Sequence, residues 1–447
     1  MSRDAETTAL PLLALLVAML LVPAGSLRAQ AGEYGALFER LKPALFTVEV
    51  VERDSGNKAA IGTAFLVTGD GRLATNYHVV SEHMLDPDRY GLRYRDADDG
   101  TGPLRLVDVD VLHDLAVVEF AEAGDRRLAP PFALADALPA IGESVLALGN
   151  PYDIGIGIVP GTFNGLATSQ YRSRIHFTGA LNPGMSGGPA VDREGAVIGV
   201  NVAAAGNSVS FLVPVEHLVG LLERLPEAPS TFDAMRSRVT ERILAHQAEM
   251  IDRLLEGDWS GERFGPMRIP REIRPWIRCT GTGRDRDPET PWSESHSNCS
   301  LDDRIYLSRS LDTGTVELVH GWYRSDGLAP LQFARIPEQT TFLAFNRTGE
   351  NDVTDFECVE GWTRHTESPA WKATWCLRAY VDYPGLHDVL YVARVPLAGT
   401  EAVHLHYTLA GVPRDAALAF HRRFVDSVDF PRSGDAAGEA GTPGNEH

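Results

Sequence analysis

Residues 181–189 read LNPGMSGGP and set one serine, Ser186, among glycines in a turn that no regular helix or strand would adopt. Glycine allows positive φ values and lets backbone N–H groups come close to a ligand. A serine on such a turn can meet a carbonyl carbon while neighbouring amides point at the carbonyl oxygen, as acyl transfer requires. A serine in a glycine-rich turn is also a common turn residue, so the stretch needs partners elsewhere in the chain.

Two upstream stretches supply those partners. Residues 74–80 read ATNYHVV and contain His78, and residues 113–118 read HDLAVV and contain Asp114. Histidine titrates near neutral pH, so His78 could take the proton of Ser186 and return it to a leaving amine. Asp114 would hold the imidazole in the correct tautomer and stabilise the imidazolium.

The oxyanion would be met by the backbone N–H groups of Gly184 and Ser186. Each side chain also has a structural interpretation: His78 as a half-buried histidine and Asp114 as an acid at a strand end. The three residues together, in the order His, Asp, Ser, indicate nucleophilic catalysis.

Short strand-like runs separated by turn residues follow one another through residues 32–225, without helical segments between them. The runs cover residues 46–51, 62–68, 104–111, 116–120, 144–148, 175–178, 196–202 and 208–213. This pattern predicts an antiparallel sandwich or a pair of barrels. A short helix is expected within residues 35–41, before Pro43.

The composition changes after residue 225. A helix with leucines at helical spacing (215–225) ends at two prolines, and all seven tryptophans and all four cysteines lie beyond it. We therefore expect two independent cores: an all-β domain at 32–225 and an α+β domain at 263–431. Residues 226–262 would form a linker and helix, for which a connecting helix is favoured over a coiled-coil dimer. The tail at 432–447 has a disordered composition.

Strands are expected in the second domain at residues 304–307, 315–322, 341–345, 373–381, 389–395 and 403–407. A last helix at 415–424 should precede a strand-like run at 425–430. Taken together, the fold class is multidomain: an all-β double barrel, a linker helix and an α+β C-terminal domain.

The N-terminus reads as a secretory signal. Residues 9–23 form an uncharged apolar run, and residues 29–31 read AQA, which predicts cleavage after Ala31. The alternative is an uncleaved anchor, but about 15 apolar residues fall short of the roughly 20 that span a bilayer. No later stretch is long and apolar enough to span, so we expect an exported protein with no stable membrane span after cleavage.

Four cysteines in an exported chain indicate two disulfides. Three connectivities are open, and the most local pairs neighbouring cysteines, Cys279 with Cys299 and Cys358 with Cys376. Zinc ligation is the rival interpretation, but no close Cys-x-x-Cys pair is present. His404 and His406 alternate on one predicted strand without a visible third ligand, so we expect no metal and no cofactor.

The formal charge of −20 argues against a nucleic-acid partner, because phosphates are repelled at long range.

Six short stretches carry a resemblance to a known family. They are residues 62–67 (GTAFLV), 75–80 (TNYHVV), 113–117 (HDLAV), 146–151 (LALGNP), 182–189 (NPGMSGGP) and 199–201 (GVN). In this order they resemble the HtrA (DegP-like) branch of the trypsin-like serine proteases over residues 36–225. The resemblance implies two barrels with the active site between them. It makes His78 the base, Asp114 its orienting residue and Ser186 the nucleophile, with Gly184 and Ser186 as oxyanion donors.

The resemblance also places Asn201 where it would support the aspartate and begin the S1 wall. Residues 179–181 and 202–205 would form that wall, and none of them is charged. A small or medium aliphatic P1 residue is therefore expected, because an arginine or lysine would find no partner. The expected substrate-binding residues are Ala180, Leu181, Asn201, Val202 and Ala203.

Two features depart from the family. Met185 stands where the family usually has asparagine, and no PDZ-type domain is found after residue 225. Our interpretation is an exported serine endopeptidase acting on proteins or peptides. The alternative is a binding or scaffold protein with a silent protease-like domain.

Overall fold

The computed structural model describes residues 24–122, 127–167, 170–204, 209–226, 230–301, 303–336, 348–363, 369–397 and 399–430. For residues 24–31, 203 and 204 only the backbone is described. Most of the predicted signal segment, the predicted strand at 341–345 and the predicted tail at 432–447 lie outside these residues.

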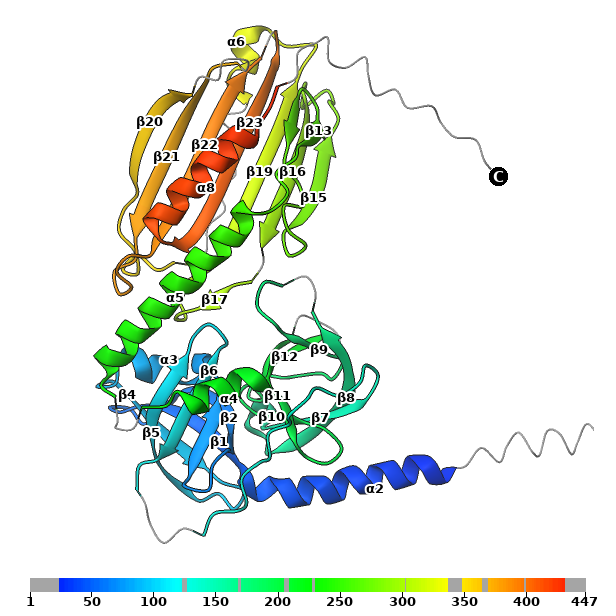
Figure 1. Cartoon of the computed structure of the whole chain (residues 1–447), viewed down its shortest axis with the longest axis vertical. Helices are drawn as coiled ribbons and strands as arrows, with labels where there is room; N and C mark the ends of the chain where they lie inside the picture. Colours follow the sequence, from blue (N-terminus) through cyan, green and yellow to red (C-terminus); the bar gives the residue numbers. More distant parts are fainter. Residues whose placement is uncertain are drawn as a thin grey trace, which may run out of the picture.

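The first half of the chain forms two closed antiparallel barrels, one of the two architectures that the strand pattern allowed and the one that the resemblance implied (Figure 1). The first barrel has the order β1-β2-β3-β6-β5-β4. Its strands are β1 (Leu45–Glu52), β2 (Lys58–Leu66), β3 (Arg72–Thr75), β4 (Tyr90–Arg95), β5 (Thr101–Asp110) and β6 (Leu115–Phe120). Closure leaves no free sheet edge, so alternate apolar residues can fill the barrel while every strand is paired.

The second barrel has the order β10-β11-β12-β9-β8-β7. Its strands are β7 (Ser144–Gly149), β8 (Gly157–Leu166), β9 (Ile175–Phe177), β10 (Pro189–Val191), β11 (Val197–Ala204) and β12 (Ser210–Pro214). A smaller apolar core, including Phe163, Phe177 and Leu212, fills it.

Helices frame the barrels. They are α2 (Ala24–Leu41), the 3-10 turn η1 (Lys42–Ala44), α3 (Tyr77–Leu85), the 3-10 turn η2 (Pro151–Asp153) and α4 (Val215–Glu223). The helix before Pro43 is longer than predicted, because α2 begins at Ala24. Among the described helices, none has both the length and the apolar character needed to cross a bilayer.

The second half is built on a seven-stranded antiparallel sheet of order β15-β16-β19-β23-β22-β21-β20. Its strands are β15 (Arg278–Arg284), β16 (Ser293–Leu301), β19 (Val316–Arg324), β20 (Glu357–Thr363), β21 (Trp371–Ala379), β22 (His387–Pro396) and β23 (Glu401–Val412). Two small strand pairs accompany it: β13 (Glu262–Phe264) with β14 (Met267–Ile269), and β17 (Ile305–Tyr306) with β18 (Asp312–Thr313).

Helix α8 (Arg414–Ser427) lies across one face of this sheet, and the short α6 (Pro330–Phe333) lies at its far end (Figure 1). Phe420 and Phe424 of α8 are fully buried against the sheet. The strand-like run expected at 425–430 is wrong in its first residues, because α8 continues to Ser427. The apolar pattern of a buried helix face explains that error.

Helix α5 (Phe232–Leu255) joins the halves, passing from the barrels to the sheet in Figure 1. Val239 and Ile243 pack in the core of the first barrel, while Met250 and Leu254 pack in the core of the sheet. It is thus the connecting helix that the sequence favoured. Thr231 begins it, with its hydroxyl accepting from the N–H of Ala234.

The second half has an apolar core of its own, as predicted, but the two cores are not independent. Six residues of the second half belong to the same apolar cluster as the strands of the first barrel: Ile305, Leu307, Leu311, Tyr380, Tyr383 and Leu386. Because this shared core is apolar, the two halves bury surface against each other rather than being joined only by a linker.

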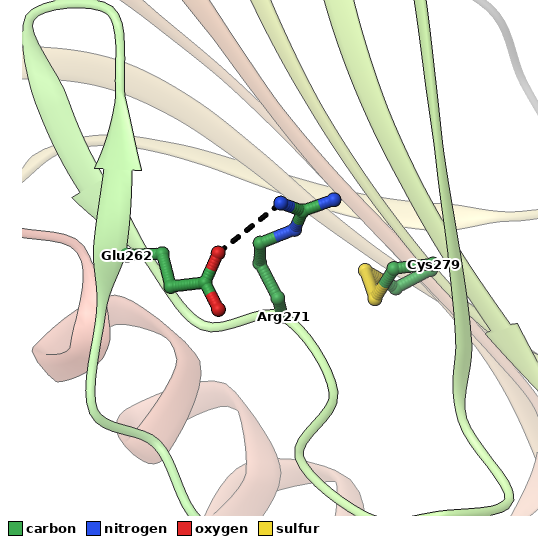
Figure 2. Close-up of a disulfide and its surroundings, with 4 residues drawn as sticks. Glu262, Arg271 and Cys279 are labelled. Atoms are coloured by element: carbon green, nitrogen blue, oxygen red, sulfur yellow. Dashed lines mark hydrogen bonds and ion pairs between the residues drawn. A yellow bond between two sulfur atoms is a disulfide. The ribbon is translucent and has the colours of Figure 1, made fainter. Parts of the chain in front are cut away.

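Two disulfides join neighbouring strands of the sheet. Cys279 pairs with Cys299 and Cys358 pairs with Cys376, the most local of the three connectivities. Beside the first lies a surface ion pair between Glu262 and Arg271 (Figure 2).

Candidate active site

The serine turn lies between β9 and β10, and its shape requires glycine. Gly184 has φ 94° and Gly187 has φ 83°. A Cβ on Gly184 would lie 2.3 Å from the Asn150 carbonyl oxygen, and one on Gly187 would lie 2.3 Å from the Thr63 carbonyl oxygen. Both positions therefore need the positive φ and the small size that only glycine combines.

Ser186 lies where the two barrels meet. Its carbonyl accepts a hydrogen bond of 2.8 Å from the N–H of Thr63 on β2. Its hydroxyl donates to the carbonyl of Val202 on β11, at 3.3 Å. The serine is thus held by the first barrel on one side and the second barrel on the other.

His78 and Asp114 form a tight pair on the first barrel. His78 lies in the first turn of α3, and Asp114 lies in the β5–β6 turn with φ 58°. Nδ1 of His78 is 2.7 Å from Oδ2 of Asp114, and its backbone N–H donates to Oδ1 at 2.8 Å. Asn76 donates its side-chain amide to the Asp114 carbonyl at 2.7 Å. These bonds fix the carboxylate against the ring, the arrangement expected of an orienting aspartate.

The electrostatics favour a basic imidazole. Burial disfavours the imidazolium, but the Asp114 carboxylate favours it more strongly, by charge and by hydrogen bonding, so the pKa of His78 is raised above its usual value. A raised pKa makes His78 a better proton acceptor.

The serine turn packs directly on the segment that carries His78. A Cβ on Gly187 would lie 2.9 Å from the backbone nitrogen of Asn76, two residues before His78. Within the described residues no hydrogen bond joins Ser186 to His78, because the hydroxyl is bonded to Val202. For the predicted proton transfer to His78, the Ser186 hydroxyl would first have to leave that carbonyl. Catalytic hydrogen bonds often tighten only when substrate is bound.

The predicted oxyanion donors are available. In the part of the chain that the structure describes, the N–H groups of Gly184 and Ser186 have no hydrogen-bond acceptor. The neighbouring carbonyl of Gly184 accepts a bond of 2.7 Å from the Thr63 hydroxyl, which itself accepts from the N–H of Asn150 at 2.9 Å. Thr63 thus ties the serine turn to the loop after β7.

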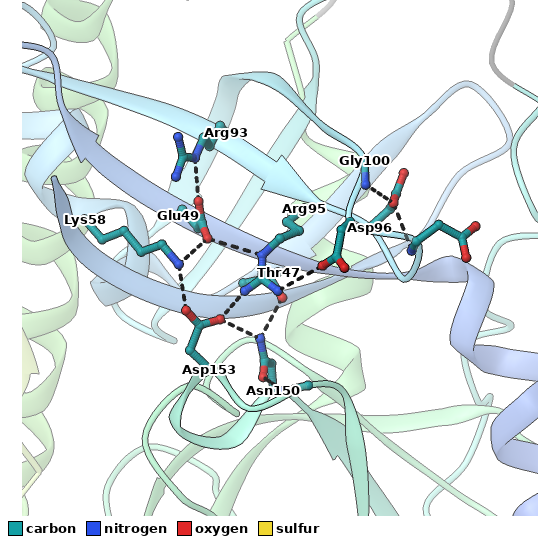
Figure 3. A network of polar contacts seen from close by, with 12 residues as sticks. Thr47, Glu49, Lys58, Arg93, Arg95, Asp96, Gly100, Asn150 and Asp153 are labelled. Atoms are coloured by element: carbon teal, nitrogen blue, oxygen red, sulfur yellow. Dashed lines mark hydrogen bonds and ion pairs between the residues drawn. The ribbon is translucent and has the colours of Figure 1, made fainter. Parts of the chain in front are cut away.

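That loop is anchored to the first barrel by charge (Figure 3). Asn150 donates to the Thr47 hydroxyl at 2.9 Å, and Asp153 pairs with Lys58 at 2.6 Å. Glu49 is only 1% exposed on its side chain and faces three cations, Lys58, Arg93 and Arg95. A buried carboxylate with several cations is costly to disturb, so the network holds the loop in place.

Asn201 does not occupy the predicted place. It is fully buried, and its amide donates to the carbonyls of Leu148 at 2.9 Å and Met185 at 3.2 Å. It therefore supports the serine turn from below and neither bonds Asp114 nor lines a cleft. The prediction was wrong because the side chain is buried and its amide is bonded to these two carbonyls.

The other predicted substrate-binding residues separate into three groups. Ala180 is exposed and Val202 is partly exposed, as a cleft wall requires. Leu181 packs in the core of the second barrel, so it is not a wall residue. The side chain of Ala203 lies outside the described residues. Met185 is fully buried in the same core, which shows how a methionine fits where the family has asparagine.

Sequence reasoning missed three residues near the site. Thr63 and Asn150 lie inside motifs that were noted, but their hydrogen bonds across the barrels had no sequence signal. Tyr306 lies against His78 from the second half, with ring centroids 6.1 Å apart. Only the tertiary structure brings it there.

Two closed barrels with a histidine–aspartate pair and a glycine-framed serine at their junction have the architecture of a trypsin-like peptidase domain. Residues 62–200 match a family described as the trypsin-like peptidase domain. These residues form such a domain.

This domain is similar to those of HtrA (DegP-like) proteases, which confirms the resemblance seen in the motifs. Protease Do-like 1, chloroplastic, from Arabidopsis thaliana is 32% identical over 194 residues, covering 40% of this chain and 42% of that protein. A probable periplasmic serine endoprotease DegP-like from Brucella suis is 36% identical over 176 residues, covering 37% and 33%. The chain thus spans less than half the length of these relatives.

Among solved structures, a serine endoprotease from Yersinia pestis matches with 25% identity and a TM-score of 0.37, covering 43% of this chain and 65% of that one.

No group of three histidine, cysteine, aspartate or glutamate side chains in the described residues is arranged to hold a metal ion. His406, one of the two alternating histidines, lies 3.0 Å from the Thr408 hydroxyl through Nε2.

Proposed function

We propose that this chain is an exported serine endopeptidase that hydrolyses peptide bonds through an acyl-enzyme. The observation that carries the proposal is the bonded pair of His78 and Asp114 beside the glycine-framed turn of Ser186. Acyl transfer needs an oriented base, an alcohol and two donors, and all four belong to segments of this protein that pack against each other.

In the proposed reaction, the Ser186 oxygen attacks the carbonyl carbon of the scissile bond while His78 takes the hydroxyl proton. The carbonyl oxygen, now negative, accepts from the N–H groups of Gly184 and Ser186. His78 then protonates the departing amine, leaving an acyl-enzyme that water hydrolyses with His78 again as base. Asp114 holds the ring and balances its charge.

The proposed substrates carry a small or aliphatic residue before the scissile bond. The Val202 carbonyl contacts the Ser186 hydroxyl, and Ala180 directly precedes residues 181–189 in the chain; neither residue has a charged side chain. A cationic residue would therefore lose its hydration without gaining a partner.

Export is supported by three observations. Residues 9–31 read as a cleavable signal, although most of them lie outside the described residues. Both disulfides suit an oxidising compartment. Several relatives are described as periplasmic.

A fluorophosphonate probe tests the proposal. Wild-type full chain should be labelled, while Ser186→Ala should not, because only an activated serine reacts with it. Peptides with Ala or Val before the scissile bond should be cleaved faster than matched peptides with Arg. A correctly folded wild type that takes no label would instead support the silent, protein-binding alternative.

A further inference from the structure

The segment between the two small strands of the second half reaches the active site. We call residues 303–313, which include β17 and β18, the docking hairpin. Figure 1 shows β17 at the level where α5 passes from the barrels to the sheet. Its residues Ile305, Leu307 and Leu311 are buried in the core of the first barrel. The hairpin is therefore built into the peptidase domain.

A buried ion pair anchors the start of the hairpin. Arg172, in the β8–β9 loop, lies 2.6 Å from a carboxylate oxygen of Asp303, and the two side chains are 5% and 6% exposed. Arg172 also donates to the carbonyl of Arg304 at 2.6 Å and to that of Leu112 in the β5–β6 turn. The hairpin is thus joined to the same turn that carries Asp114.

Further contacts hold the hairpin on α3, the helix that carries His78. The hydroxyl of Tyr77 donates to the Leu307 carbonyl at 2.7 Å, and both groups are buried. Arg309 pairs with Glu82 at 3.1 Å. With bonds on both sides of it, residue 306 has little freedom to move away from α3.

Tyr306 fills the place between these contacts. Its ring meets the rings of His78 and Tyr77 edge-on, with centroids 6.1 Å and 6.3 Å apart. Its hydroxyl lies 3.4 Å from the hydroxyl of Ser81. Tyr306 remains partly exposed, and the His78 side chain is 29% exposed, so neither side chain is closed off from solvent.

In the proposed reaction the substrate passes beside this pair of rings. Because the base must reach both the nucleophile and the departing amine, a bound peptide has to cross the imidazole. A ring fixed beside the imidazole limits the space for the substrate side chains that flank the scissile bond there.

Resting on the proposed function, we propose that Tyr306 is a specificity-determining residue that the second half adds to the peptidase cleft, selecting small side chains next to His78. The selection is steric, because the ring is held by Tyr77 and Ser81. Removing the ring opens that space, so substrates with larger side chains at this position should be cleaved with a higher kcat/KM.

The test uses the full chain and a set of peptides that share one P1 residue. The residues two positions before and one position after the scissile bond are varied between Ala and Phe. In Tyr306→Ala the ratio of kcat/KM for Phe over Ala peptides should rise about tenfold at one of these positions, the range expected for a changed hydrophobic pocket. Tyr306→Phe keeps the ring and should keep the wild-type ratio.

Trp362→Ala is the matched control, because this aromatic side chain is 65% exposed on the edge strand β20 of the same half. Its ratio should equal that of wild type. Tyr306→Leu retains apolar packing without the ring. It therefore tests whether the ring sets specificity even if Tyr306→Ala fails to fold. Its ratio should also rise.

The outcomes separate the two proposals. If the wild type is labelled by the fluorophosphonate and the ratio is unchanged in the folded Tyr306 variants, the specificity role is overturned while the peptidase stands. An unlabelled wild type overturns both.

Discussion

At the scale of single residues, Thr63 connects the two barrels at the site. Its hydroxyl donates to the Gly184 carbonyl and accepts from the Asn150 N–H, and its N–H donates to the Ser186 carbonyl. The residue is fully buried, so none of these groups has water as a substitute. The Thr63 hydroxyl is therefore one of the groups that fix the position of the predicted oxyanion donors.

We predict that Thr63→Val lowers kcat by about 10²-fold, because a displaced turn aims its donors wrongly. The variant also leaves two backbone groups unpaired, at a cost of about 1–3 kcal/mol each. Thr63→Ser retains the hydroxyl and should keep most of the activity. The measurement is kcat on a peptide substrate, with denaturation curves for both variants. Equal kcat values for the two variants would argue against this role.

At the scale of elements, the β8–β9 loop and the docking hairpin meet through Arg172 and Asp303. Burying two charges is costly, and removing one partner leaves the other charge uncompensated. The ion pair between Arg271 and Glu262 in Figure 2 is a natural comparison, because those side chains are 41% and 67% exposed.

We expect Arg172→Met to destabilise the protein by about 3–5 kcal/mol, because the buried Asp303 carboxylate loses the cation that balances its charge. Arg271→Met should cost less than about 1 kcal/mol. Urea denaturation followed by tryptophan fluorescence gives both values, since all seven tryptophans lie beyond residue 225. Adding Asp303→Leu to Arg172→Met should restore stability. Similar losses for the two arginine variants would contradict the buried-pair argument.

At the scale of the whole molecule, buried neutral histidines set the response to pH. Burial lowers the pKa of His320 and His404 to about 3 and that of His406 to about 4. In the unfolded chain these histidines become protonated below about pH 6.5, whereas in the folded chain they stay neutral until about pH 3–4. Stability from these residues is therefore complete above pH 6.5 and lost as the pH falls towards 4.

His320 offers a direct test, because neither of its ring nitrogens has a hydrogen-bond partner in the described residues and the ring stacks on Phe424. We predict that His320→Leu is no less stable than wild type at pH 7.5. Between pH 7.5 and 5 it should lose about 2 kcal/mol less than wild type. Denaturation at several pH values, again by tryptophan fluorescence, measures this difference. Parallel pH curves would show that His320 does not titrate in this way.

The sequence alone predicted the barrels, the connecting helix, the local disulfides and the peptidase resemblance, because these depend on local patterns and motifs. Strand β8 shows the limit of prediction from local patterns. Its glycines and Pro160 are unfavourable for a strand, but the strand forms because it pairs with β7.

The requirement for glycine at 184 and 187 was readable from the sequence, since a positive φ is a local property of the chain. The inward direction of Asn201, the shared core and the position of Tyr306 were decided only by the tertiary structure. Each depends on contacts between residues far apart in the chain, and those contacts exist only once whole cores have packed together.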